Sequence, residues 1–80
     1  MKLQEAVAIR LTELLVKKNM TRYSLCRKIA MNESTVYNII NGRCKSINMS
    51  TLFLIAHGLD ITPCEFLDNA IFDKDKIEID

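Results

Sequence analysis

Residues 21–42 carry the stretch that decides the fold, TRYSLCRKIAMNESTVYNIING. Thr21 and Asn32 are residue types that cap helix N-termini, and each precedes a run with apolar positions at helical spacing. Gly42 follows the second run, where glycine ends a helix in the left-handed conformation. The stretch therefore predicts two short helices joined by a tight turn. They run from about Arg22 to Ala30 and from Glu33 or Ser34 to Asn41.

The second predicted helix has one apolar and one polar face. Val36, Ile39 and Ile40 share the first, and Ser34, Asn38 and Asn41 share the second. Two helices joined at a steep angle by a three- to four-residue turn form a helix-turn-helix, which places its second helix in the major groove of DNA. The polar face would then contact bases, although an ordinary solvated helix face has the same pattern.

Three further helices are predicted around this stretch, and the fold class is all-α. They span about residues 3–18 and 49–59, with a fifth opening at Thr62-Pro63-Cys64-Glu65, a capping-box pattern. The residues expected to pack inward are Leu3, Val7, Leu11, Leu14, Leu15, Leu25, Ile29, Leu52, Ile55, Ala56, Leu59, Phe66 and Leu67. Ile9 and Val16 form a second apolar stripe on the back of the first helix. We expect residues 1–69 to form the domain and residues 70–80 an acidic tail, in which Lys76–Ile79 alternates as a short strand would, with a frayed terminus as the alternative.

The charges are segregated along the chain. Nine Lys/Arg and three acids lie in residues 1–45, and two Lys and seven acids lie in residues 46–80, so the net charges are +6 and −5. A basic half indicates a polyanion-binding surface, and solvated surface charge is the alternative. With no long apolar run and no signal-peptide core, we expect a cytoplasmic protein.

Catalytic and metal-binding patterns are not evident. The three cysteines form no CxxC pair, the single histidine is His57, and no glycine-rich phosphate loop occurs. We therefore expect no enzyme activity, no metal site and no cofactor. Cys44 lies between Arg43 and Lys45, which would favour its thiolate, so redox control at this residue is a separate hypothesis.

From Val7 to Leu67 the sequence resembles the helix-turn-helix family of Cro and lambda-type phage repressors, also called the XRE family. The matching pieces are IRLTELL (9–15), Met20-Thr21, STVYNIINGR (34–43) and TLFLIAHGLDI (51–61), in family order and spacing. The resemblance implies a five-helix, lambda-repressor-like fold. Three positions depart from the family pattern: Ala30 replaces the usual turn glycine, Arg22 replaces the usual glutamine, and Leu15 with Ile40 replace an Arg–Glu pair that some members bury.

The resemblance also implies a map of DNA contacts. The base-reading residues would be Glu33, Ser34 and Asn38, because Asn pairs with adenine, Glu accepts from the cytosine amino group, and Ser does either. The residues expected at the DNA backbone are Arg22, Asn32, Thr35, Tyr37, Asn41, Arg43 and Lys45. Such contacts fix the register of the protein but do not read sequence directly.

A domain of this size usually reads two half-sites as a homodimer, so we expect one here. Phe53 and Leu54 are apolar positions left over after the core is built, and the tail offers Ile71, Phe72, Ile77 and Ile79. Either set would form the dimer contact, and the tail is expected to cover the Ile9/Val16 stripe, in its own subunit or across the dimer.

The function that these patterns favour is a sequence-specific transcriptional regulator bound to double-stranded DNA, with repression implied by the resemblance. Two alternatives are open: an antitoxin or mobile-element controller, and a protein-interaction module on the same fold. Salt-sensitive DNA binding would separate the last of these from the others.

Overall fold

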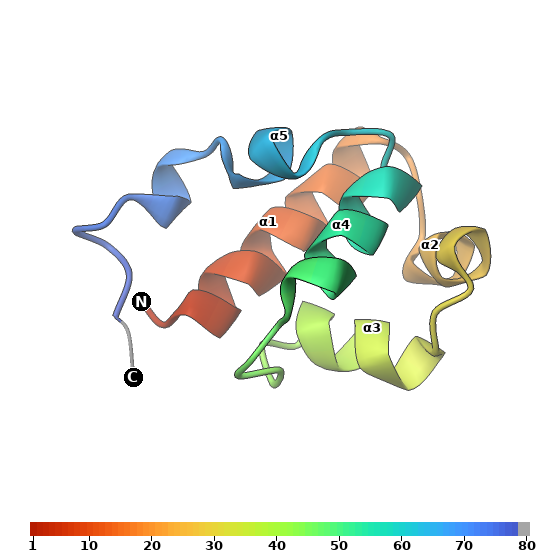
Figure 1. Ribbon diagram of the computed structural model, residues 1–80, viewed down its shortest axis with the longest axis horizontal. Helices are drawn as coiled ribbons and strands as arrows, with labels where there is room; N and C mark the ends of the chain where they lie inside the picture. Colours follow the sequence, from red (N-terminus) through yellow and green to blue (C-terminus); the bar gives the residue numbers. More distant parts are fainter. Residues whose placement is uncertain (79–80) are drawn as a thin grey trace.

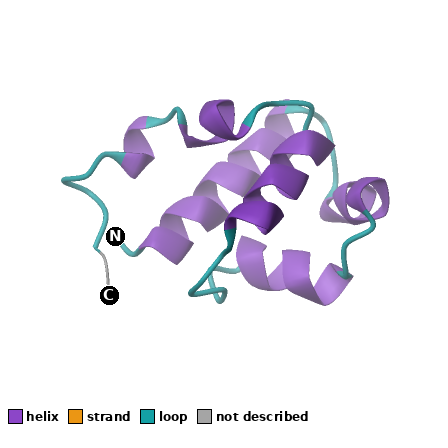
Figure 2. Cartoon of the chain, in the orientation of Figure 1, coloured by secondary structure: helices purple, strands orange, loops and turns teal. Residues whose placement is uncertain are grey.

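The predicted helices are all present in the computed structural model, which describes residues 1–78. The elements are α1 (Leu3–Lys17), α2 (Arg22–Ile29), α3 (Glu33–Ile40), α4 (Met49–Gly58), α5 (Pro63–Leu67) and the 3-10 helix η1 (Ala70–Phe72). Each helix end lies within one or two residues of its predicted position. Figure 2 shows helices joined by loops, and no strand is drawn in the described part of the chain. The all-α fold class is therefore confirmed.

The helices enclose one apolar core. α3 packs on α1, α2 packs on both α3 and α4, α5 packs on α4, and η1 packs on α1 (Figure 1). The largest fully buried side chains are Leu11, Leu25, Val36, Ile55, Leu59 and Phe66, so every α-helix contributes at least one. No polar or charged residue among residues 1–78 is buried. The core thus rests on apolar burial, at about 25 cal/mol per Å² of apolar surface removed from water.

Two predicted core residues are on the surface. Leu3 is 42% exposed and Leu67 is 43% exposed. Leu3 is the first residue of α1, and it borders a crevice that it shares with Lys45 and Ile47 of the loop after α3. Leu67 is the last residue of the five-residue α5, where Phe66 alone is buried. Helical periodicity misplaces both because a helix end presents a side chain to fewer neighbours than its middle does.

Four helices end in the same way, with a residue of positive φ followed by a backbone bond that reaches five residues back. The four residues are Asn19, Ala30, Gly42 and Asp60, with φ of 54°, 51°, 69° and 60°. The closing bonds are Met20 N–H to Leu15 O, Met31 N–H to Cys26 O, Arg43 N–H to Asn38 O and Ile61 N–H to Ala56 O. This arrangement satisfies carbonyls that a helix end would otherwise leave free.

Of these four residues, Ala30 is the one for which the left-handed conformation is most unfavourable relative to glycine. Its φ of 51° and ψ of 39° place it in the left-handed region, so α2 ends before it, at Ile29. Its Cβ makes that conformation unfavourable by about 1 kcal/mol relative to glycine. The turn between α2 and α3 keeps the expected backbone without the usual residue.

Gly58, the last residue of α4, allows α4 to approach α2 closely. A Cβ built on Gly58 would lie 2.6 Å from Ile29 Cγ2 and 2.6 Å from Leu25 Cδ1. Real Cβ atoms do not occur at that distance from another carbon atom. α4 therefore supports the buried side of α2 directly, and any side chain at residue 58 would force Ile29 and Leu25, or α2 itself, to shift.

The tail folds back on the start of the chain. Phe72 packs against the core with its ring centroid 6.3 Å from that of Phe66. Glu78 N–H donates to Met1 O at 2.7 Å, and Lys2 and Glu78 form an isolated parallel bridge. The predicted strand at Lys76–Ile79 is thus reduced to one bridge, and Ile79 lies outside the described residues. Figure 1 shows the start of α1 and the tail close together, away from α2.

The tail does not cover the back of α1 in its own chain, so that form of the prediction is wrong. Ile9 is 43% exposed and Val16 is 76% exposed. η1 contacts α1, but its Phe72 is directed to the apolar core and not to the stripe. A cover supplied by a second chain stays a prediction. None of the described helices has the length and hydropathy needed to span a bilayer.

Candidate nucleic-acid interface

Side-chain caps fix the starts of both helices of the motif. Thr21 Oγ1 accepts from the backbone N–H of Ser24 at 3.1 Å, and Asn32 Oδ1 accepts from that of Ser34 at 2.7 Å. Such caps are worth about 1 kcal/mol each. Asn32 is predicted as a DNA-backbone contact, and its side-chain oxygen is already committed to α3. Only its amide hydrogens would be left for a phosphate.

α3 separates its side chains cleanly between core and solvent. Val36 is fully buried and Ile39 is 2% exposed, whereas Glu33, Ser34, Thr35, Tyr37 and Asn38 are all exposed. The two buried residues lock α3 against α1 and α2. The orientation of the polar face is therefore set by packing, and the predicted base-reading residues all lie on the solvent side.

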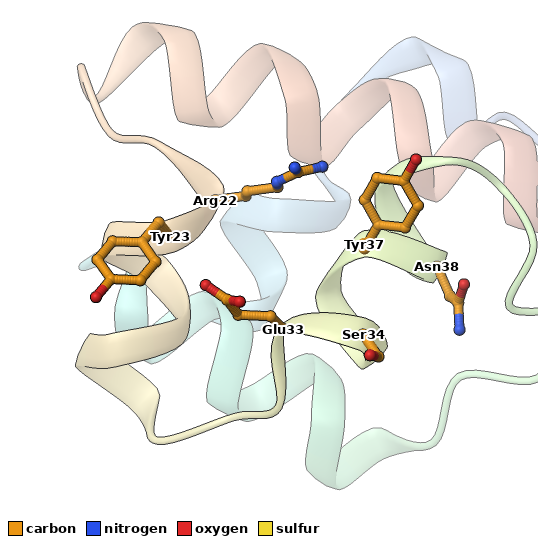
Figure 3. Close-up of a pocket in the computed structure, with 6 residues that line it drawn as sticks. All are labelled: Arg22, Tyr23, Glu33, Ser34, Tyr37 and Asn38. Carbon is orange, nitrogen blue, oxygen red and sulfur yellow. The ribbon is translucent and has the colours of Figure 1, made fainter.

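A groove opens between α2 and α3 on this solvent side. We call it the α2–α3 groove; its volume is ≈ 630 Å³, and its lining residues are Arg22, Tyr23, Glu33, Ser34, Tyr37 and Asn38. Figure 3 shows that Arg22 and Tyr23 come from α2 and the other four from α3. The structure thus brings together all three predicted base readers and two of the predicted backbone contacts.

Arg22 and Tyr37 meet across the groove. The Arg22 guanidinium carbon lies 4.6 Å from the centroid of the Tyr37 ring, and Figure 3 shows Arg22 extending from α2 toward that ring. A second pair lies within α2 alone, where the Arg27 guanidinium carbon is 5.8 Å from the Tyr23 centroid. Cation–π contacts at exposed sites are worth about 0.5–1 kcal/mol.

Cys26 lies behind the groove as part of the core. It is 4% exposed, and the pKa of its thiol is raised, chiefly by burial and further by the nearby Glu33 carboxylate. Arg22 acts in the opposite direction on the same pKa. The thiol therefore stays protonated and packs as a small apolar side chain.

The other predicted backbone contacts lie at the far end of α3. Asn41 Nδ2 donates to the Tyr37 carbonyl at 2.9 Å, which uses one of its amide hydrogens within α3. Gly42 lies against the first turns of α1, where a Cβ added to it would be 3.8 Å from the Gln4 carbonyl oxygen. Lys45 borders a small crevice beside the same part of α1. Arg43 and Lys45 are exposed, and neither they nor Asn41 line the α2–α3 groove.

The cations around α3 form no ion pair with a carboxylate in the described part of the chain. The one ion pair between side chains of residues 1–78 joins Lys28 to Asp60 at 3.3 Å. Arg22, Arg43 and Lys45 thus make no ion pair with a carboxylate of those residues. Their positive charge is available to an external anion. No cluster of three or more potential metal-ligating side chains occurs in the described residues.

Two features of the groove are not anticipated from the sequence. No role is predicted for Tyr23, although it is 56% exposed on α2 and lines the groove. Its position next to Arg22 in the sequence is the available signal. The Arg22–Tyr37 contact is also unexpected, because the two residues are fifteen positions apart and belong to different helices. Spacing along one helix does not reveal such a pair.

The fold and groove define a helix-turn-helix protein: two capped helices, with the second presenting a polar face beside exposed cations. The family model for the Cro/C1-type HTH DNA-binding domain matches residues 10–69, three quarters of the chain. The protein therefore belongs to the Cro/C1-type helix-turn-helix family, as the resemblance predicted, and has the DNA-binding regulatory character of that family. No curated protein and no solved structure matches it.

Proposed function

We propose that this protein is a sequence-specific repressor that binds operator DNA as a homodimer and inserts α3 into the major groove. The observation that carries the proposal is the exposed row on α3, Glu33, Ser34 and Asn38, held outward by the buried Val36 and Ile39. Each of the three side chains has donors or acceptors that match base edges in the major groove.

The size of α3 suits this role. An α-helix is about 10–12 Å across with its side chains, close to the width of the major groove, and the eight residues of α3 extend about 12 Å along its axis. Asn32 lies at its N-terminal end, Arg22 reaches it from α2, and Asn41, Arg43 and Lys45 follow its C-terminal end. With Thr35 between them, these residues would contact phosphates on either side of the major groove and fix the register of the protein on the DNA, while Tyr37 would act through the Arg22 that stacks on it.

The first experiment measures binding of the full chain to a fluorescently labelled random duplex by anisotropy at several salt concentrations. The observed affinity should fall steeply with salt, because each phosphate contact releases counterions. Arg43→Ala should reduce the slope of log affinity against log salt by about one unit and weaken all duplexes alike. Absence of salt-sensitive binding to any DNA would favour an interaction module and overturn the proposal.

Sequence specificity and symmetry are tested by selecting bound duplexes from a random pool. The selected sites should contain two related half-sites about 34 Å apart between their centres. A pool that shows no enrichment after repeated rounds would contradict sequence reading. Placed over a promoter, a selected site should lower reporter expression when the protein is present, and increased expression would contradict repression.

The proposed dimer contact is the outer face of α4, where Phe53 is 54% exposed and Leu54 is 44% exposed. Sedimentation should give a dimer for the unmodified chain and a monomer for Phe53→Gln with Leu54→Gln. His57→Ala, on an exposed position of the same helix, is the matched control and should leave the dimer intact. If the double variant stays dimeric and removal of residues 70–80 dissociates it, the tail is the contact instead.

A further inference from the structure

Arg22 is an unfavourable residue for the position that it occupies. It is the first residue of α2, where the helix dipole is positive, and α2 has no acidic residue in its first turn. A cation at a helix N-terminus is unfavourable because it opposes the positive end of the helix dipole. Arg22 is also exposed and contributes nothing to the core. Helix stability therefore gives no reason for an arginine here.

The groove contains a carboxylate that would compete for Arg22. Glu33 begins α3 and lines the same groove, yet the two side chains form no ion pair, since the ion pairs of residues 1–78 lie elsewhere. Arg22 instead stacks on Tyr37, at 4.6 Å from the ring centroid. In Figure 3 the Glu33 side chain is directed away from Asn38 and lies apart from the Arg22–Tyr37 contact.

Stacking on an aromatic ring leaves the N–H donors of an arginine exposed. A guanidinium lying on an aromatic ring keeps its N–H groups in its own plane, where they can donate in pairs to a phosphate. Tyr37 is 41% exposed, so its ring is a surface platform and not a core side chain. Because α2 and α3 supply one partner each, the contact also fixes Arg22 relative to the reading face.

From these observations we infer that Tyr37 is a positioning residue, which holds Arg22 ready for a DNA phosphate and keeps it from pairing with Glu33. The inference rests on the proposed DNA binding and adds a determinant of specificity to it. With Arg22 held by Tyr37, the Glu33 carboxylate stays free to accept from a cytosine amino group. Without the ring, Arg22 and Glu33 would neutralise each other.

The test compares Tyr37→Phe and Tyr37→Leu by anisotropy on a selected duplex. Tyr37→Phe keeps the ring and should bind within about twofold of the unmodified chain, whereas Tyr37→Leu should bind about two- to fivefold more weakly. His57→Ala is the control, because His57 is exposed on α4 outside the α2–α3 groove, and it should have little effect. Equal losses for Tyr37→Phe and Tyr37→Leu would assign the effect to the hydroxyl and overturn the inference.

A double-mutant cycle separates positioning from a structural role of the ring. In an Arg22→Ala background, Tyr37→Leu should cause no further loss, because the group that it positions is absent. An unchanged loss in that background would show that Tyr37 acts independently of Arg22. Arg22→Lys should also bind more weakly despite its retained charge, since an ammonium lacks the planar fork of donors.

Base preference provides the second readout. In site selections, Tyr37→Leu should weaken the cytosine preference at the base pair that changes when Glu33 is replaced by Gln, while the preference assigned to Asn38 is kept. A uniform loss of preference at all positions would contradict the inference. If the unmodified chain binds no DNA, the proposed function fails; if it binds but Arg22 and Tyr37 are uncoupled, only this inference fails.

Discussion

The motif at residues 21–42 and the tail at residues 70–78 are both built from short helical segments with a side-chain cap. Asn32 caps α3, and Asn69 Oδ1 accepts from Ile71 N–H at 2.9 Å to cap η1. They differ in what lies behind them. The motif has five buried apolar side chains and the close support of α4, whereas no residue of η1 is fully buried. Side-chain capping is therefore common to the motif and the tail. They differ in burial, because only the motif is fixed by apolar side chains packed in the core.

The largest effect should come from removing the close support behind the motif. Gly58→Ala places a Cβ against Ile29 and Leu25 and should lower the free energy of unfolding by about 1–3 kcal/mol, the usual cost of overpacking. Urea denaturation followed by circular dichroism measures it. Ser50→Ala, an exposed position of α4, is the control. A loss below about 0.5 kcal/mol would mean that α2 can move away from α4 easily.

Asn38→Ala should change DNA binding by the exposed face of the motif without changing the packing that supports it. Because Asn38 is exposed, unfolding should be unchanged, whereas binding to a selected duplex should weaken by about 1–3 kcal/mol with relaxed preference at one base pair. Fluorescence anisotropy with the selected duplex and with a random duplex measures the affinity for each and hence the loss of specificity. Equal weakening on the two duplexes would refute direct base reading by Asn38.

Phe72→Ala tests how much the tail contributes. A fully buried Phe typically contributes about 3–5 kcal/mol, and Phe72 is only partly buried against Phe66, so we expect a loss of about 1–2 kcal/mol. Calorimetry should show a lower melting temperature, with DNA affinity unchanged while the protein is folded. Lys74→Ala, exposed in the same segment, should have no effect. A melting temperature that Phe72→Ala leaves unchanged would make the tail energetically irrelevant.

The smallest effect concerns the turn inside the motif. Ala30→Gly relieves the left-handed strain and should raise the free energy of unfolding by about 0.5–1 kcal/mol. Ala30→Val, with a branched side chain at the same φ, should lower it. Thermal unfolding of the pair measures the difference. If the two variants shift in the same direction, the strain at Ala30 is not what limits the turn.

Most of the motif could be predicted because its signals are local. Thr21, Asn32 and Gly42 mark helix ends through contacts within a few residues, and all three occur as expected. The alternation of Val36 and Ile39 with Ser34 and Asn38 also fixes which face is outward. The DNA contacts assigned to these residues stay predictions.

The remaining features depend on contacts between distant parts of the chain. The pairing of Arg22 with Tyr37 needs the angle between α2 and α3, and the close approach at Gly58 needs the position of α4 against α2. The tail differs from its prediction for the same reason. Its alternating residues predict a strand, but the pairing partner within residues 1–78 is Lys2 alone, and a single bridge results. Sequence periodicity indicates the conformation of one segment, but it does not identify the segment that packs or pairs with it.

The Arg10 side chain links α1 to α5 through two hydrogen bonds. Its Nε and an Nη atom donate to the backbone carbonyls of Phe66 and Glu65, each at 2.8 Å and across 56 and 55 positions of sequence. α2 and α3 need only a short loop to meet, whereas this link closes a loop of 56 positions, at a greater entropic cost. During synthesis the motif can therefore take shape early, while α1 cannot be fastened to α5 until residue 66 has left the ribosome.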